Sequence, residues 1–208
     1  MIGARQKYGS VQKAMNTWRD YMVSMGFGYQ LGIDLPGEKR GMIPNAQYYD
    51  KAYRRSWNGL TIISISIGQG EVTATPLQIA NLGATIANRG YFVTPHVVKE
   101  IEGESIDSIY TTRRYTKVDK GHYEEVVQGM RSAVLGGTCR TANIPELEIC
   151  GKTGTAQNHG KDHSAFMGFA PMNNPKIAIA VYVENGGWGA TYGVPIGKLV
   201  IEKYLLVS

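Results

Sequence analysis

The sequence predicts an α+β domain in which helices flank a small antiparallel sheet. Three segments near the C-terminus have the pattern of strands, at residues 148–157, 164–170 and 177–183. A polar turn joins the first two, and a proline-containing turn joins the last two. Such short links imply antiparallel pairing, because parallel strands need a crossover of a dozen or more residues. The 177–183 strand is apolar throughout, so we expect it to be buried on both faces.

The composition is that of a globular domain. The chain has 208 residues, of which 43% are hydrophobic and 19% charged, and this excludes a disordered chain and a highly charged coiled coil. The length suits a single domain over 1–208, with a core large enough to need no metal or disulfide. Glycine is abundant, at 26 residues, which favours turns and close backbone approaches over a helical bundle.

The distributions of charge and hydropathy argue against two further classes of protein. The net charge is +5, but the basic residues are scattered, so we expect no nucleic-acid partner. The sequence contains no run of 18 apolar residues, the length that a membrane-spanning helix needs. Met1 leads into Arg5 and Lys7 without an apolar segment behind them, so no export signal is predicted in this chain.

Two helix signals precede the strands at some distance. Ser10 can cap a helix that ends before Gly26 and carries its apolar residues on one face. Thr75 and Pro76 form an N-cap followed by proline at the first helical position, and this second helix ends near residue 90. It is apolar on more than one side, so we expect it to be buried at the centre of the core.

The remaining segments fill in the α+β pattern. Residues 27–57 are loop-like and are punctuated by glycine and proline, whereas 91–118 have the pattern of short strands and turns. A last helix is expected over about 195–206 and covers one face of the sheet. A third helix precedes the strands, with one apolar face made of Tyr123, Val126, Val127, Met130 and Val134.

The first predicted strand carries the sequence with the clearest chemical meaning, GKTGTAQ at 151–157. It would place a lysine, two hydroxyls and hydrogen-bond donors on one face, and its inner glycine lets a ligand backbone lie close. This combination suits an acyl substrate with a carboxylate. The ammonium and hydroxyls would hold the anion, while backbone N–H groups face the developing oxyanion.

Five ordered segments place this strand in a family context. They are GIDLPGE at 32–38, WNG at 57–59, IGQG at 67–70, TATPLQ at 73–78 and GKTGTAQ at 151–157. In text, order and spacing they resemble class B penicillin-binding proteins, for which K-T-G is a known motif. The WNG and IGQG segments resemble the elongation-type members more than the division-type members.

The resemblance implies a β-lactamase/transpeptidase-like fold and the activity of a serine-type peptidoglycan D,D-transpeptidase. Such an enzyme cross-links stem peptides and is acylated by β-lactams. By position, Lys152, Thr153, Gly154 and Thr155 would form the substrate-carboxylate and oxyanion side of the cleft. No metal and no cofactor are implied. The parent protein would be membrane-anchored and periplasmic or extracytoplasmic, with peptidoglycan stem peptides, β-lactams and membrane proteins of the elongation machinery as partners.

The family also needs a nucleophilic serine three residues before a lysine, and an S-x-N element, both ahead of the GIDLPGE-like segment. We expect them upstream of this chain, which would then be the C-terminal portion of a transpeptidase domain without its N-terminal strands and nucleophile helix, inactive by itself. Ser10 and Lys13 fit S-x-x-K but belong to the polar face of a helix, where a lysine stays protonated. Ser56 fits S-x-N but follows GIDLPGE.

Two alternative functions stay open at this point. One is a complete small serine acyl hydrolase that uses Ser10, Lys13 and Ser56. The other is a non-catalytic module that binds stem peptides. Missing strands would also leave an unpaired sheet edge, through which two copies could dimerise.

The remaining reactive side chains give weaker signals. His159, Asp162 and His163 could suggest a metal site, but they belong to a glycine-containing turn, so a solvated loop is expected. Cys139 and Cys150 fit no CxxC or zinc spacing, and the sequence leaves open whether they pair.

Overall fold

A three-stranded antiparallel sheet organises the C-terminal part of the structure, a computed structural model that describes residues 6–206. Its strands are β3 (Cys150–Ala156), β4 (His163–Ala170) and β5 (Ile177–Val183), with β4 in the middle. These bounds confirm the predicted strands and their antiparallel pairing. The prediction about an export signal concerns an N-terminal segment of which residues 1–5 lie outside the described part.

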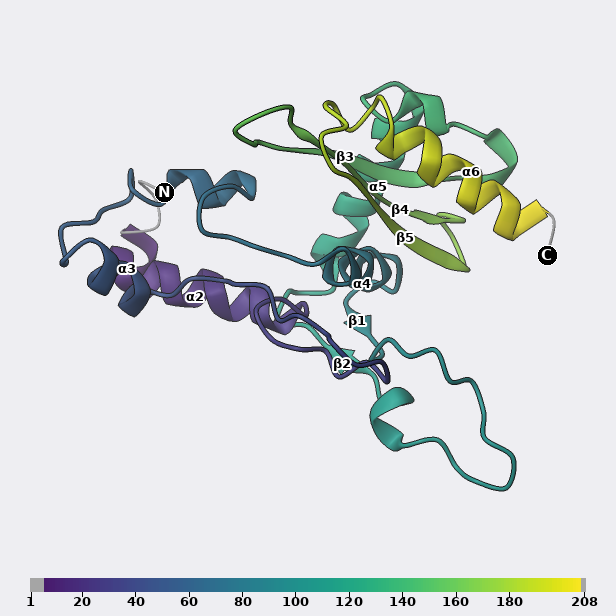
Figure 1. The fold of residues 1–208 in the computed structure, drawn as a ribbon, viewed down its shortest axis with the longest axis horizontal. Coiled ribbons are helices and arrows are strands. Elements are labelled where there is room, and N and C mark those ends of the chain that lie inside the picture. The colour runs from purple at the N-terminus through teal and green to yellow at the C-terminus, as the bar shows by residue number, and fades with distance from the viewer. Residues whose placement is uncertain (1–5, 207–208) are drawn as a thin grey trace.

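Helices cover both faces of this sheet, as Figure 1 shows. Helix α6 (Gly193–Leu206) packs on one face, and helices α4 (Pro76–Ala87) and α5 (Gly121–Leu135) pack on the other. Each face has its own core, with Phe166 at the centre of the α6 side and Phe169 at the centre of the α4–α5 side. The expected α+β fold is therefore confirmed, and each of these helices packs apolar residues against the sheet.

Glycines allow α6 to lie very close to the sheet. The ring of Phe166 is 1% exposed, and a Cβ added at Gly197 of α6 would stand 2.4 Å from its Cδ1 atom. From the sheet side, a Cβ at Gly151 or Gly168 would stand 2.5 or 2.6 Å from the same ring. The aromatic side chain thus occupies space that any side chain at these three positions would need.

Helix α4 is buried, as predicted, but its most buried positions include polar residues. Thr75 caps it and forms a reciprocal capping box with Gln78. The Gln78 side chain, 1% exposed, donates to the carbonyls of Tyr29 and Arg40 at 3.0 and 2.9 Å. These bonds fasten the segment before the helix to it, which explains why a helix without an exposed face carries polar side chains inside.

The N-terminal part folds around a third apolar cluster that includes Tyr49 and Trp57. Helix α2 (Val11–Ser24) confirms the first predicted helix, and Ser10 caps it by accepting a hydrogen bond from the Lys13 N–H. The expectation that 27–57 is loop-like is wrong in part, because helix α3 (Ala46–Ala52) interrupts it. Shorter 3₁₀ turns complete the chain: η1 (Ile63–Ile67), η2 (Ser108–Tyr110), η3 (Arg140–Ala142) and η4 (Pro145–Leu147).

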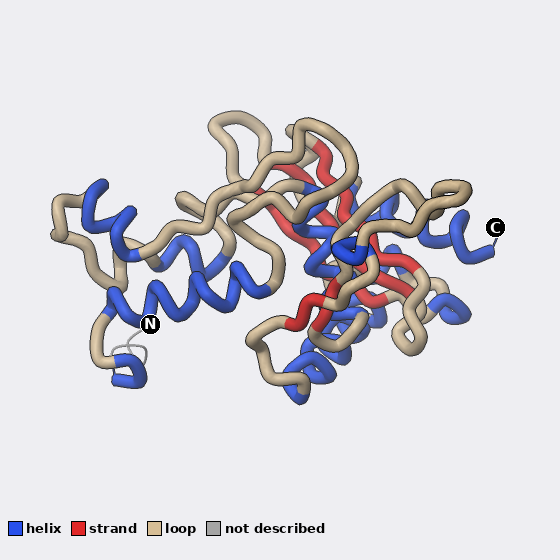
Figure 2. The backbone as a smooth tube through the Cα atoms, turned by 90° about the horizontal axis from the view of Figure 1, so that it is seen from below, coloured by secondary structure: helices blue, strands red, loops and turns tan. Residues whose placement is uncertain are grey.

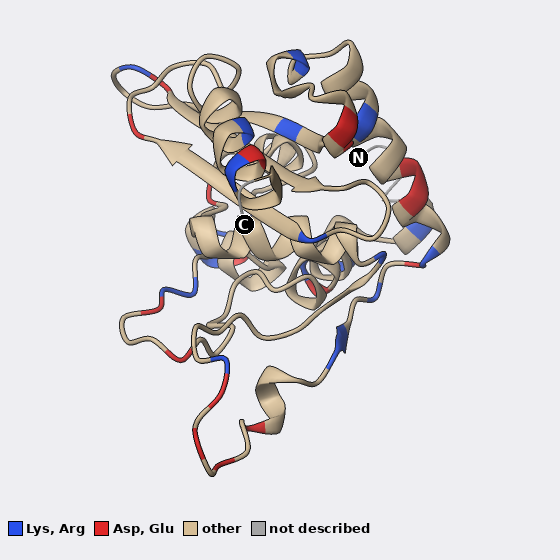
Figure 3. Ribbon diagram, turned by 90° about the vertical axis from the view of Figure 1, so that its right-hand side faces the viewer, with Lys and Arg blue, Asp and Glu red and all other residues tan. Residues whose placement is uncertain are grey.

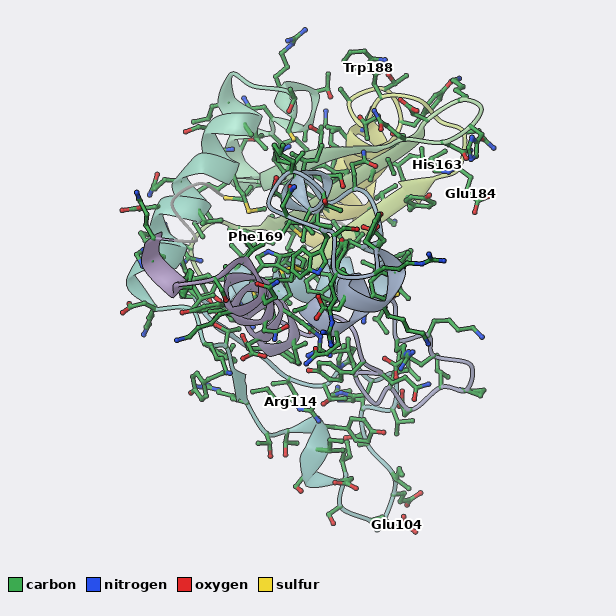
Figure 4. All side chains as sticks on the ribbon, turned by 90° about the vertical axis from the view of Figure 1, so that its left-hand side faces the viewer. Glu104, Arg114, His163, Phe169, Glu184 and Trp188 are labelled. Atoms are coloured by element: carbon green, nitrogen blue, oxygen red, sulfur yellow. The ribbon has the colours of Figure 1, made fainter. Side chains whose placement is uncertain are left out.

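A long arm projects from the body between the short strands β1 (Tyr91–Phe92) and β2 (Arg114–Tyr115), which pair with each other. In Figure 4, Glu104 on the arm lies at the opposite end of the molecule from Trp188, which lies near the sheet. Acidic residues gather on the arm in Figure 3. The predicted short strands and turns of 91–118 are confirmed.

Two expectations about burial are wrong. Strand β5 is half-buried along most of its length, and Tyr182 is 40% exposed, because within residues 6–206 only β4 pairs with it. Val126 is 45% exposed, since it borders a recess beside Lys152 instead of packing into the core. Its four predicted partners on α5 are buried.

The described part of the chain holds no helix long and apolar enough to cross a membrane. In Figure 2, long loops and turns (tan) connect the helices and strands.

Candidate active site

Strand β3 carries the predicted site residues at an edge of the sheet. Its only neighbour within residues 6–206 is β4. In an antiparallel strand the N–H and C=O of one residue point to the same side, and the side alternates from residue to residue. Lys152 Nζ donates to the Thr153 carbonyl at 2.7 Å, and Gln69 Nε2 donates to the Thr155 carbonyl at 3.3 Å. Both carbonyls therefore point outward, away from β4.

The side chains of this strand divide between the two faces. Lys152 pairs in register with Met167, which packs on the α4–α5 side, whereas Thr153 pairs with Phe166 on the α6 side. The expectation that the lysine and the hydroxyls share one face is wrong, because neighbouring residues of a strand point to opposite faces. They meet instead at the edge, where the Lys152 ammonium bends back to the Thr153 carbonyl.

A second segment approaches β3 beyond its outer edge. Thr138, which follows α5, lies with its Oγ1 atom 2.9 Å from the Thr153 Oγ1 atom. Sequence reasoning missed this residue, since nothing in its local sequence marks a contact with β3. It fixes the hydroxyl of Thr153 at the edge.

A cavity of about 450 Å³ opens beside Gly154 and Thr155. The turn at Gly68–Gly70 and the start of α4 form its opposite wall, so the structure brings together three of the five segments singled out in the sequence. Tyr182 of β5 closes one side. The prediction that 68–70 is a tight turn before the Thr75 helix is confirmed. The IGQG motif predicted this turn, but the sequence did not predict that the Gln69 amide donates to the Thr155 carbonyl.

The other two segments do not line the cavity. The Trp57 indole is buried and donates to Asp50 at 2.7 Å. In the GIDLPGE segment, Glu38 accepts three backbone N–H bonds of its own loop, from Leu31, Gly32 and Ile33.

Asp34 of the same segment holds the base of the arm. Its carboxylate accepts hydrogen bonds from the N–H groups of Val98 and Val97, at 2.9 and 3.0 Å. These bonds hold the pKa of Asp34 below its usual value.

The structure does not bring the alternative nucleophiles to the cavity. Ser10 serves as the cap of α2, and the Ser56 hydroxyl donates to the carbonyl of Tyr53. Neither residue, nor Lys13, lines the cavity beside Thr155.

The two cysteines are free and fully buried. Burial raises the pKa of Cys150 to about 11 and also raises that of Cys139. Both thiols therefore stay protonated near neutral pH and behave as small apolar residues.

The histidine turn is organised by local contacts. His163 Nδ1 accepts the Asn185 N–H at 3.0 Å, and its ring lies against Tyr182. Figure 4 shows His163 and Glu184 at the same end of the sheet. Within residues 6–206, no group of three or more His, Cys, Asp or Glu side chains is placed to hold a metal ion.

A family comparison agrees with this fold. The model of the penicillin binding protein transpeptidase domain matches residues 6–202. The chain therefore belongs to the penicillin-binding protein transpeptidase family.

Within the family, similar proteins include several of the penicillin-binding protein 2 type. The peptidoglycan D,D-transpeptidase MrdA of Acinetobacter baumannii is 38% identical over 92% of this chain. A structure of Pseudomonas aeruginosa PBP2 in complex with WCK 5153 superposes with a TM-score of 0.81 at 37% identity, covering 92% of this chain and 43% of that one. The Helicobacter pylori PBP2 of a complex with MreC superposes with a TM-score of 0.77 at 28% identity, covering 95% of this chain and 36% of that one. The chain spans 31% of the length of the Acinetobacter relative.

Proposed function

We propose that the chain is the C-terminal portion of the transpeptidase domain of a peptidoglycan D,D-transpeptidase that works in cell-wall elongation. One observation carries the proposal: Gly154 and Thr155 of β3 border a cavity of about 450 Å³, and Gly68 and Gln69 line it from the other side. Lys152 of the same strand borders the neighbouring recess. An open strand edge beside a cation suits an extended peptide that ends in a carboxylate.

Each of the four site residues has a role in this proposal. Thr155 turns both its N–H and its C=O to the edge, so its N–H can stabilise the oxyanion that develops on the attacked carbonyl. The Lys152 ammonium and the Thr153 hydroxyl attract the terminal carboxylate of a D-alanyl-D-alanine stem peptide. Gly154 has no side chain, so the peptide can lie close to the strand.

The nucleophilic serine and its lysine base are proposed to come from a segment that precedes this one in the parent protein. None of the residues that line the cavity is a serine or a lysine. Acyl transfer needs both a hydroxyl and a neutral amine within hydrogen-bond reach of each other.

We therefore expect that the 208-residue chain forms no covalent adduct with benzylpenicillin. Intact-mass spectrometry after prolonged incubation should give the unmodified mass. The Ser10→Ala variant serves as the matched control, because Ser10 is the serine of the S-x-x-K pattern. A stoichiometric penicilloyl adduct that disappears in this variant would instead establish the small serine acyl hydrolase.

The partners and location proposed for the parent protein follow from the family. It is membrane-anchored with this domain in the periplasm or an equivalent extracytoplasmic space, and it binds β-lactams and membrane proteins of the elongation machinery. The complex of the Helicobacter relative with MreC supports such a partnership.

The open edge of β5 gives a separate prediction about self-association. Its seven residues include no charge, glycine or proline, which makes the strand a ready template for pairing. We expect the isolated chain to sediment increasingly as a dimer as its concentration is raised. Tyr182→Lys places a charge on this edge and should keep it monomeric, whereas Tyr115→Lys, on the separate small sheet, should still dimerise. Monomeric wild-type chain at all concentrations would contradict the prediction.

A further inference from the structure

Two side chains donate hydrogen bonds to outward carbonyls of β3, those of Thr153 and Thr155. One is Lys152, from the strand itself, and the other is Gln69, from a turn far away in the sequence. Unpaired edge carbonyls attract other strands, so donors placed on them protect the edge. The Lys152 bond measures 2.7 Å, whereas the Gln69 bond measures 3.3 Å and lies beyond the usual range for N–H···O bonds. The Gln69 bond is therefore the weaker and the more easily exchanged of the two.

The turn aims Gln69 at the strand. Gly68 and Gly70 on either side of it have φ angles of 75° and 70°, a region that favours glycine. The N–H of Gln69 itself donates to the Ser64 carbonyl at 3.1 Å, and a Cβ at Gly70 would lie 2.7 Å from the Ser64 Oγ atom. The backbone is thus fixed, while the side-chain amide projects into the cavity next to Thr155.

The Thr155 carbonyl is also the acceptor that a bound peptide needs. Antiparallel partners at a hydrogen-bonded position exchange both bonds, so a peptide whose carbonyl meets the Thr155 N–H presents its own N–H to the Thr155 carbonyl. In the structure the Gln69 amide holds that place.

We propose that Gln69 is a removable cap on the peptide-binding edge of β3, and that every ligand that brings a backbone N–H to the Thr155 carbonyl must displace it in order to bind. The inference rests on the proposed function and deepens it. A ligand with this N–H exchanges one hydrogen bond for another, at the cost of displacing Gln69. A ligand without it leaves Gln69 in place.

The test measures the binding of two matched ligands to the 208-residue chain by NMR titration, followed at the amide signals of Thr153–Thr155. The first ligand is diacetyl-L-lysyl-D-alanyl-D-alanine. In the second, D-lactate replaces the penultimate D-alanine, so that an ester oxygen stands in place of the N–H. Gln69→Ala is expected to lower the dissociation constant of the peptide about fivefold, the order of a single exposed hydrogen bond, and to leave that of the ester unchanged.

Two further variants make the outcome specific. Gln69→Met keeps the length of the side chain without its donor, and it should behave like Gln69→Ala even if the shorter side chain loosens the turn. Gln30→Ala removes a comparable exposed amide, which donates to the Glu38 carbonyl at 2.7 Å, and should change neither dissociation constant.

The results separate the cap from the proposed function. Equal changes for both ligands, or weaker peptide binding in both Gln69 variants, would show that Gln69 only stabilises the turn, and would overturn the cap alone. If neither ligand shifts the Thr153–Thr155 signals in any variant, the peptide-binding edge itself is overturned.

Discussion

Gly197→Ala is expected to lower the free energy of unfolding by about 3 kcal/mol, at the upper end of the range for overpacking a core. The added Cβ would lie 2.4 and 2.5 Å from two ring atoms of Phe166. The ring has little room to retreat, because it lies against the sheet so closely that even a Cβ added at Gly151 or Gly168 would stand 2.5 or 2.6 Å from it. Helix α6 would have to move off the sheet, and this loses more than alanine gains through its higher helix propensity. Urea unfolding followed by circular dichroism measures the change.

The control is a helical glycine in open surroundings. Gly129 of α5 is exposed, and an added Cβ there meets no atom within 4 Å. Gly129→Ala should therefore raise the free energy of unfolding by about 0.5–1 kcal/mol. If both variants gained stability, the close approach of α6 to Phe166 would be wrong.

Gln78→Ala is the second substitution with a large expected effect, a loss of about 3 kcal/mol. It removes the donor for the carbonyls of Tyr29 and Arg40 and the acceptor for the Thr75 N–H. A partner left without its hydrogen bond in a buried place costs about 1–3 kcal/mol. The segment that bears GIDLPGE should also separate from α4, so its amides should exchange with solvent faster.

Urea unfolding and amide hydrogen exchange measure these two effects. Gln128→Ala is the control, because Gln128 lies exposed on α5, where its side chain donates to the Glu124 carboxylate at 3.1 Å. It should change stability by less than about 0.5 kcal/mol. Unchanged exchange in the GIDLPGE segment of Gln78→Ala would contradict the fastening role.

Local sequence predicted most of the elements, because their signals are local. Thr75 and Pro76 place the start of α4, and Ser10 places the start of α2, through hydrogen bonds within a few residues. The three strands were predicted because their turns are short. Helix α3 was missed for the opposite reason. It is short and rich in tyrosine, and it depends on contacts with residues far along the chain, such as the hydrogen bond that the Tyr49 hydroxyl donates to Glu71, 22 positions away.

The same distinction between local signals and long-range contacts applies to the candidate site. The motif at 151–157 located the strand, but not its orientation. Strand alternation alone puts Lys152 and Thr153 on opposite faces, but only the pairing with β4 shows that Lys152 lies on the α4–α5 side and Thr153 on the α6 side. The contact of Gln69 with Thr155 joins residues 86 positions apart, and no local pattern encodes such a distance. The half-buried state of β5 likewise depends on what pairs with its edge, which its own apolar sequence does not reveal.

The close packing around Phe166 also constrains how this part of the protein can evolve. A larger aromatic residue at 166 has no space to enter, and a smaller one leaves a void that a Cβ from a glycine could partly fill. A substitution at Gly151, Gly168 or Gly197 that is harmful with phenylalanine could thus become tolerable beside a smaller residue. These positions form one epistatic unit, in which the effect of each mutation depends on which residue occupies 166, and in which single steps are penalised while paired steps are allowed.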